Sequence, residues 1–200
     1  MAYSTSPETV WHSAPSSEED DEPGESSTSR ARGASATDVS GGDADFTVET
    51  TIVGAGGEAI DAPWIESRVI DACRHLGVRQ GQLSLVVLGD DEMADAHRRH
   101  LGVDGPTDTL SFDLRDASDA EDATRVEGEV LLGGGVARRQ AEQRGHAVRL
   151  ELLLYALHGL LHLLGEDDRC EADFRRMHEK ENELLEAIGL PPIADTDPSR

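Results

Sequence analysis

The sequence predicts an α+β domain in which a small mixed sheet is flanked by helices. Four short segments are rich in Val, Ile, Leu and Thr, as strands are, and five longer segments place apolar residues at helical spacing. Helices and strands are mixed along the chain, and no internal repeat is present. This pattern indicates a layered domain in which helices pack against a sheet.

The four expected strands cover residues 46–53, 83–88, 109–113 and 126–132. The first alternates apolar and polar residues and is rich in Val, Thr and Ile, and the second contains the run Ser-Leu-Val-Val-Leu. An acidic loop, 116–124, joins the last two strands. We therefore expect these two strands to be neighbours in the sheet, as in a hairpin.

The five expected helices cover residues 62–76, 90–101, 136–144, 149–164 and 171–188. Pro63 stands in the first turn of the first helix, where proline is favoured, and Gly77 ends that helix. Asp90 or Asp91 can cap the second helix. Gly189 ends the last, amphipathic helix ahead of two prolines.

Composition divides the chain of 200 residues into one domain, 46–190, between an acidic N-terminal tail, 1–45, and a C-terminal tail, 191–200. The first 45 residues are rich in Ser, Glu, Asp, Gly and Thr, and they lack apolar periodicity. We expect this tail to be disordered, because it cannot bury enough apolar surface to offset the entropy of ordering. The remaining domain is long enough to bury an adequate core.

The segment from His158 to Asp168 is the most informative part of the chain. His158 and His162 stand four residues apart in a leucine-rich run, so on a helix they lie on one face and can share a metal ion. Gly165 provides a helix stop, after which the turn delivers three acidic residues, 166–168. A carboxylate from this trio can supply a third ligand and leave a fourth position for water, as in catalytic zinc sites.

The same residues also allow other interpretations. A histidine pair at this spacing is often two ordinary polar residues, although buried imidazoles need a partner. Zinc peptidases carry a Glu directly after the first His as general base; that position is Gly159 here, so the motif is a different one. Asp168 can instead cap the last helix. Cys170 and His178 are further candidate ligands.

Three segments follow one another in a recognisable order. Residues 158–167 contain His-Gly-x-Leu-His-Leu-x-Gly-x-Asp, residues 104–112 are Asp-Gly-Pro-Thr-Asp-Thr-Leu-Ser-Phe, and residues 127–130 are Glu-Gly-Glu-Val. Together they resemble the signature blocks of the YbeY family, metal-dependent endoribonucleases implicated in ribosomal RNA maturation. The order and spacing match from about residue 46 to 190, which is the whole expected domain.

This resemblance implies a metal-binding helix beside a cleft, with one Zn²⁺ per chain held by His158, His162 and Asp168. It implies single-strand endoribonuclease activity in rRNA maturation, including 16S rRNA processing, and a role in ribosome biogenesis. Asp168 stands where the family usually has a third His, and a carboxylate oxygen is also an accepted zinc ligand. Leu101 stands near the position of an arginine that is credited with a catalytic role in the family, so that residue is not carried over.

Charge and cysteine content bound the partners and the compartment. The formal net charge is −23, which is unusual for an RNA-binding protein. Positive charge is local: Arg98, Arg99, Arg138 and Arg139 are candidate RNA contacts, although arginines on helices also form solvated faces. Two isolated cysteines favour a reducing cytoplasm. No signal peptide and no membrane span are expected.

Three functions compete on these grounds. The first is a zinc-dependent endoribonuclease that acts on ribosomal RNA, with the ribosome or its proteins as partners. The second is a metal hydrolase of a peptide or small phosphoester, an alternative that the missing arginine and the acidic surface leave open. The third is a ribosome-assembly factor with a structural metal. The proton acceptor is also open: water on the metal, Asp108, Asp167 and the 2′-hydroxyl of RNA are the alternatives.

Overall fold

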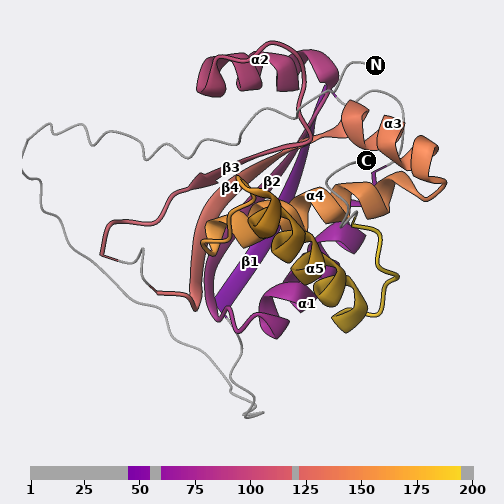
Figure 1. Cartoon of the computed structure of the whole chain (residues 1–200). Coiled ribbons are helices and arrows are strands. Elements are labelled where there is room, and N and C mark those ends of the chain that lie inside the picture. The colour runs from indigo at the N-terminus through magenta and orange to yellow at the C-terminus, as the bar shows by residue number, and fades with distance from the viewer. Residues whose placement is uncertain (1–44, 55–59, 119–121, 195–200) are drawn as a thin grey trace, which may run out of the picture.

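The computed structural model describes residues 45–54, 60–118 and 122–194, and Figure 1 shows their arrangement. The expected acidic tail lies outside the described residues except for Asp45, as do residues 119–121 of the acidic loop and 195–200 of the C-terminal tail. Strands and helices occur in the predicted order. No helix in the described part of the chain is long and apolar enough to cross a membrane.

The strands are β1 (Asp45–Val53), β2 (Gln80–Leu88), β3 (Thr109–Asp113) and β4 (Arg125–Gly133). They form one mixed sheet in the order β1-β2-β4-β3. β2 runs parallel to both β1 and β4, whereas β3 is antiparallel to β4. The expected pairing of the last two strands is confirmed. The position of β4 between β2 and β3 was not predicted.

β2 begins three residues before the predicted start. Residues 80–82 offer no apolar side chain, so the hydrophobic pattern misses them. Their backbones nevertheless pair on both sides, with Gln80 opposite both Asp45 and Arg125. Backbone N–H and C=O groups need partners whatever the side chain, and a central strand provides them along its whole length.

The helices are α1 (Ala62–His75), α2 (Asp90–Leu101), α3 (Gly134–Arg144), α4 (Val148–Leu163) and α5 (Glu171–Ala187). α1 connects the parallel strands β1 and β2, as such a crossover requires. α3 starts two residues earlier than expected, because Gly134 and Gly135 are helical although they carry no apolar signal. At Gly135 a Cβ atom would lie 2.1 Å from Oδ1 of Asp90, so glycine lets α3 approach the start of α2.

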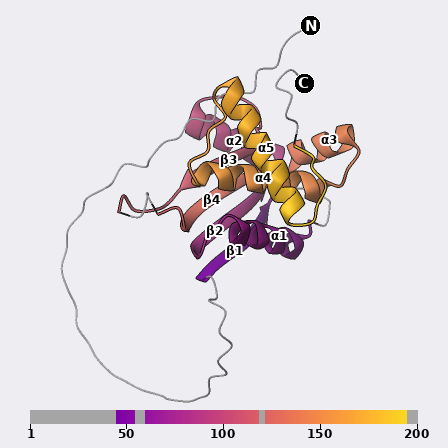
Figure 2. The same cartoon turned by 60° about the horizontal axis from the view of Figure 1, so that its bottom comes forward.

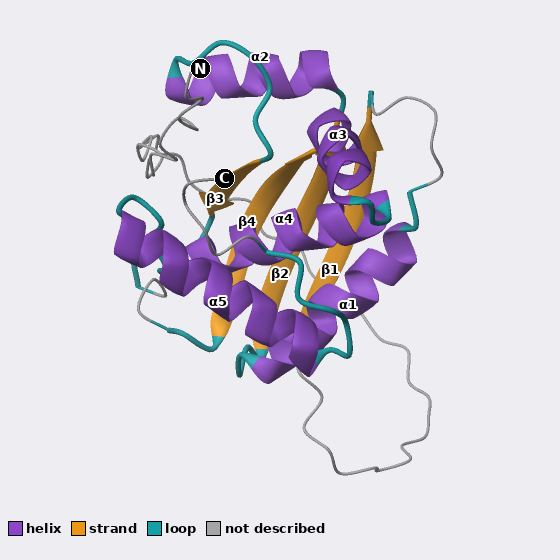
Figure 3. Ribbon diagram, turned by 45° about the vertical axis from the view of Figure 1, so that its right-hand side comes forward, coloured by secondary structure: helices purple, strands orange, loops and turns teal. Residues whose placement is uncertain are grey.

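Helices lie on both faces of the sheet, which confirms the α+β fold class. Figures 2 and 3 show α1, α4 and α5 over one face, where they enclose the main core. Side chains alternate between the faces along each strand. Leu85 and Val87 of β2 therefore point into the main core, whereas Val86 and Leu88 pack in a second apolar cluster with Met93 of α2.

Arg115 ties the loop after β3 to the end of α4. Its side chain is only 8% exposed and forms an ion pair with Asp113 at 2.7 Å. Its guanidinium also donates to the backbone oxygens of Leu163, at 2.7 Å, and Arg125, at 3.3 Å. Leu163 is the last residue of α4, whose final carbonyls have no partner within the helix. The turn that follows α4 is thereby held against the β3–β4 edge of the sheet.

Candidate metal centre

α4 approaches the sheet closely because two glycines, Gly159 of α4 and Gly128 of β4, leave room where helix and sheet meet. A Cβ atom on Gly159 would lie 2.5 Å from Cγ1 of Val130 and 2.8 Å from Oγ of Ser111. A Cβ atom on Gly128 of β4 would lie 2.6 Å from Cδ1 of Leu163. A side chain at position 159 would therefore collide with the sheet. This is the physical reason why the glutamate of the zinc-peptidase motif cannot occupy that position.

One face of α4 carries four polar side chains, Glu151, Tyr155, His158 and His162, and the rest of the helix is apolar except for Arg149. Their intervals of four, three and four residues place them on a single stripe. Glu151 and Tyr155 were not among the predicted site residues. The available signal was an acidic residue inside a leucine run, on the same helical face as the histidines.

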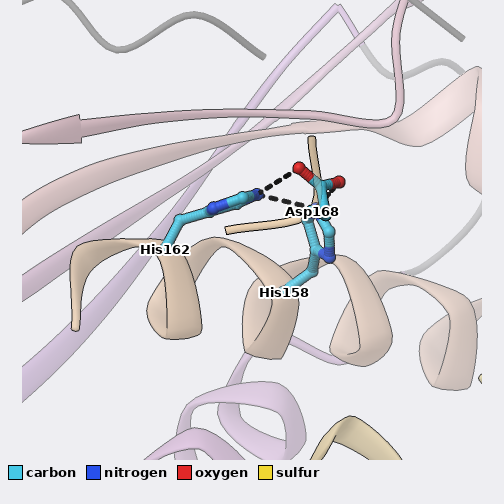
Figure 4. A group of neighbouring side chains, drawn as sticks. All are labelled: His158, His162 and Asp168. Carbon is cyan, nitrogen blue, oxygen red and sulfur yellow. Dashed lines mark hydrogen bonds and ion pairs between the residues drawn. The ribbon is translucent and has the colours of Figure 1, made fainter. Parts of the chain in front are cut away.

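His158, His162 and Asp168 bring three donor atoms together, as Figure 4 shows. Nε2 of His158 lies 3.0 Å from Nε2 of His162. The oxygens of Asp168 lie 3.7 Å from the first of these nitrogens and 3.8 Å from the second. Around a tetrahedral zinc ion with bonds of about 2.0–2.1 Å, neighbouring donors are about 3.3 Å apart. In both size and chemistry, the three residues fit one face of such a site.

A second hydrogen bond orients each imidazole. Nδ1 of His158 lies 2.7 Å from Oε1 of Glu181, and Nδ1 of His162 lies 2.9 Å from the backbone oxygen of Glu166. Because carboxylate and carbonyl oxygens accept, each Nδ1 carries a hydrogen. In the neutral ring the lone pair is then on Nε2, the atom that faces Asp168. Histidines that bind metals in proteins are held in this way.

The pKa values of the two imidazoles are shifted in opposite directions. Burial lowers the pKa of His158, but the hydrogen bond and charge of Glu181, with the charges of Asp108 and Asp168, outweigh burial and raise that pKa to about 9. Burial and the charge of His158 lower the pKa of His162. The two Nε2 atoms lie 3.0 Å apart, so each ring influences the charge of the other. A metal cation competes with protons for the lone pairs of these nitrogens.

The turn after α4 gives the three acidic residues, 166–168, different contacts. Gly165 has a φ of 92°, a conformation that glycine adopts readily, and this confirms the predicted helix stop. Oδ1 of Asp167 accepts from the backbone N–H of Asp168 at 2.8 Å. Glu166 forms an ion pair with Lys180. Of the three acidic residues, Asp168 is the one whose carboxylate groups with the histidines.

In the structure Asp168 does not cap a helix, and neither Cys170 nor His178 joins the group formed by His158, His162 and Asp168. The N-cap of α5 is Cys170, without a side-chain cap bond, so Asp168 does not cap that helix. Sγ of Cys170 is exposed and contacts Oδ2 of Asp173 at 3.0 Å. His178 lies next to the centre rather than in it, since its Nδ1 contacts Glu181 at 2.5 Å.

Glu181 is the most important residue that the sequence did not reveal. It is fully buried on α5 and lies between two histidines. Met177, Leu184 and Ile188 are buried at helical spacing around it. A glutamate on the apolar face of an amphipathic helix was the signal that could have identified it.

The segment 104–112 borders the centre. Oδ1 of Asp108 accepts from the backbone N–H of Thr109 at 2.8 Å, as a turn residue does, and the charge of Asp108 also raises the pKa of His158. Ser111 Oγ is buried against α4 and has no hydrogen-bond partner among the described residues. This segment therefore contacts α4.

The four arginines predicted to contact RNA lie in two separate places. Arg98 and Arg99 are in the last turn of α2, where both contact Asp95. Arg138 and Arg139 are on α3, where Arg139 forms an ion pair of 2.6 Å with the first residue of α2. Because α2 packs on the opposite face of the sheet from α4, the first pair does not lie with the three donors.

The end of α2 is built from apolar and buried contacts. Leu101 packs against the second apolar cluster. Buried His97 contacts the backbone oxygen of Gly105 at 2.8 Å and so ties down the following loop. At the position near which the family resemblance would place an arginine, this corner holds an apolar side chain instead.

Two hollows on the described surface are lined by α5. One is lined by its exposed N-terminal half, and the other lies where α1, α4 and α5 meet, with His75, Leu164 and Lys180 among its lining residues. Neither includes the three donor residues, so neither is the cleft expected beside the metal helix. The centre is identified by its converging donor atoms and not by a hollow.

Residues 61–189 match the family model described as Endoribonuclease YbeY. A protein of that name from Frankia alni is 45% identical over 52% of this chain and 61% of its own length, and one from Bacillus subtilis is 32% identical over 63% and 85%. A further relative of that name, from Frankia casuarinae, is 43% identical, and the match spans 55% of its length. The chain thus spans only somewhat more than half of these two Frankia relatives.

A solved structure has the same fold. The solution structure of TM1509 from Thermotoga maritima matches 70% of this chain and 89% of that protein, with a TM-score of 0.50 and 22% identity. At that identity the likeness supports the fold alone. The family match covers well over half of the chain and includes the complete donor set, so the chain belongs to the YbeY family.

Proposed function

We propose that this chain is a metal-dependent endoribonuclease, a hydrolase that cleaves phosphodiester bonds of single-stranded RNA. The name shared by the family model and the relatives supports this reaction class. The observation that carries it is the convergence of two imidazole nitrogens and one carboxylate within 3.0–3.8 Å of one another. The catalytic domain in this proposal is residues 46–190.

We infer that the metal is zinc, one ion per chain, held by His158, His162 and Asp168. Two nitrogens and an oxygen are ligands that zinc accepts, and three protein ligands leave one position for water or substrate. When bound, the ion supplies Lewis acidity toward a phosphoryl oxygen or water. The chain itself holds the three donor residues in place. At position 159 it has a glycine, so no carboxylate follows His158 to act as a base.

A proton acceptor must therefore come from another element. Asp108 is an exposed carboxylate directly before β3, and its charge contributes to the raised pKa of His158; we infer that it takes a proton from the 2′-hydroxyl of RNA. In this proposal Asp108 is the general base.

The substrate in this proposal is ribosomal RNA, including 16S rRNA, with the ribosome as partner in the cytoplasm. Arg98, Arg99, Arg138 and Arg139 are proposed as contacts to its phosphates. Each lost contact should lower the salt dependence of RNA binding by a slope of about 0.7. Arg74, an exposed arginine paired with Asp71 on α1, provides the control that should leave the slope unchanged.

The test combines elemental analysis with cleavage of single-stranded RNA before and after chelation. Cleavage should stop on chelation, return with zinc, be absent in His158→Ala and persist in His75→Ala, which changes an exposed histidine of α1. Turnover of peptides or small phosphoesters without RNA cleavage would instead indicate a different hydrolase. Tight metal binding without any turnover would indicate an assembly factor.

A further inference from the structure

We propose that Glu181 of α5 is a positioning residue of the metal centre, which holds His158 in the tautomer and orientation that metal binding requires. This inference rests on the proposed function and deepens it. It assigns a task to a residue from a different helix, 23 positions away from the ligand that it contacts.

Both oxygens of Glu181 are used on histidines. Oε1 lies 2.7 Å from Nδ1 of His158, and Oε2 lies 2.5 Å from Nδ1 of His178. A carboxylate accepts, so both Nδ1 atoms carry hydrogens. The contact therefore determines which nitrogen of His158 is left to bind a metal, and it fixes the rotation of the ring toward Asp168.

Packing alone does not account for a carboxylate at this position. Its side chain is 0% exposed, and burying a charged group costs free energy even when it is paired. Neighbouring positions on this face of α5 are apolar, among them Met177 and Leu184. A hydrophobic residue would fill the same place without that cost. The contact with a metal ligand is what the carboxylate adds.

Glu181 also balances charge. Two neutral imidazoles and one carboxylate leave a divalent ion with net positive charge in a buried place. A second carboxylate behind His158 offsets that charge and makes the ligating nitrogen more basic. His178 holds the other oxygen of Glu181, and Phe174 packs edge-on against His178 with ring centroids 4.1 Å apart. The carboxylate is thus held from both sides.

A second cation is the competing explanation, because His158, His178 and Glu181 also offer donor atoms within 4.8 Å of one another. The separations of 2.7 and 2.5 Å are hydrogen-bond distances. They are shorter than the spacing of about 3.3 Å between donors around one ion. The geometry therefore favours positioning, and metal stoichiometry distinguishes the two.

The experiment titrates zinc into the full chain in competition with a chromophoric chelator. Glu181→Ala removes the acceptor and the charge, and Glu181→Gln keeps an acceptor and removes the charge. Zinc should bind about 10–100-fold more weakly to Glu181→Ala, with Glu181→Gln in between. Glu183→Gln, an exposed change on the same helix, should stay within about twofold, since it lies outside the centre.

Cobalt(II) supplies a readout that a merely structural role would not move. Its ligand-field absorption should change most in Glu181→Ala, in which the ring of His158 is no longer held, and less in Glu181→Gln, which keeps an acceptor but not the charge. Zinc affinity and cobalt spectra equal to those of the wild type would overturn the positioning role, even if the variants unfold at lower temperature. Should Glu181→Ala not fold, Glu181→Gln alone decides.

Two further outcomes are kept apart by the wild-type chain and His158→Ala. Two zinc ions per wild-type chain would overturn positioning in favour of a second metal site. A folded wild-type chain that binds no zinc, or a His158→Ala variant that binds it undiminished, would overturn the metal centre itself. Failure of the proposed function is thus distinguishable from failure of the role of Glu181.

Discussion

At each half of α4 a histidine lies beside a fully buried carboxylate, but the surrounding charges differ. In the N-terminal half, Glu151 accepts from Nη1 of Arg144 at 2.8 Å and lies 3.0 Å from Nε2 of His146. In the C-terminal half, Glu181 holds His158, whose other nitrogen faces His162. The first carboxylate is compensated by a guanidinium from within the protein.

The second half is not compensated in this way. There, two imidazole nitrogens and the carboxylate of Asp168 converge, and the pKa of His158 is raised whereas that of His162 is lowered. Burial of charge is common to both halves and does not mark a functional site. Convergence of three side chains that could hold a metal ion is what distinguishes the second half. The following predictions test this distinction.

The largest effect is expected for the double variant His158→Ala, His162→Ala. One remaining carboxylate rarely holds zinc, so affinity should fall by about 10³-fold or more, equivalent to about 4 kcal/mol. Zinc per chain after dialysis measures the effect. Full occupancy in this variant would show that the metal is bound elsewhere.

Asp168 tests the third donor. Asp168→Ala should weaken zinc binding by about 100-fold, or about 2.7 kcal/mol, whereas Asp168→His should retain it because imidazole nitrogen is an equivalent ligand. Chelator competition measures both. If Asp168→Ala and Asp168→Asn both keep their zinc, Asp168 is not a ligand and its carboxylate only lies near the pair.

Arg144→Ala tests the compensated half. It leaves Glu151 buried with less compensation and should lower the free energy of unfolding by about 2 kcal/mol, a discounted value because the arginine side chain is 36% exposed. Zinc affinity should not change. Arg74→Ala, in an exposed pair with Asp71, should cost no more than about 1 kcal/mol. Equal costs of the two variants, by denaturant unfolding, would contradict the distinction.

Glu151 should add a smaller, pH-dependent effect. Burial raises its pKa above the ordinary value, the charges of Arg144 and His146 oppose that rise, and the charge of Asp108 adds to it. In the interval between the two pKa values the folded state holds more protons than the unfolded state. The contribution of Glu151 to stability is therefore complete below the unfolded pKa of about 4.3 and is lost as pH rises through the folded pKa.

Comparison with Glu151→Gln isolates the pH-dependent contribution of Glu151 to the free energy of unfolding. The free energy of unfolding of the wild type, minus that of the variant, should decrease as pH rises above about 4.3. Denaturant titrations at several pH values, with chelator present, measure the difference. A difference that rises with pH would mean that Arg144 and His146 overcome the burial of Glu151.

Local features of the sequence predicted most of the fold and the three donors. His158, His162 and Asp168 lie within one helix and its turn, so helical period and a glycine stop are enough to bring them together. The contact between Glu181 and His158 depends on how α5 packs over α4, and a glutamate on an acidic helix resembles many solvated ones. Likewise, apolar patterns identify strands but not the insertion of β4 between β2 and β3.

The glycine contact between α4 and β4 constrains how this chain can evolve. A single substitution at Gly159 would give the sequence a histidine–glutamate pair like that of zinc peptidases. Such a variant would displace the helix from Val130 before its carboxylate could serve as a base. A change in β4 would have to come first, and that change alone leaves a void in the core. The close packing of α4 against β4 therefore separates the His-Gly motif of this chain from the His-Glu motif of zinc peptidases by more than one substitution.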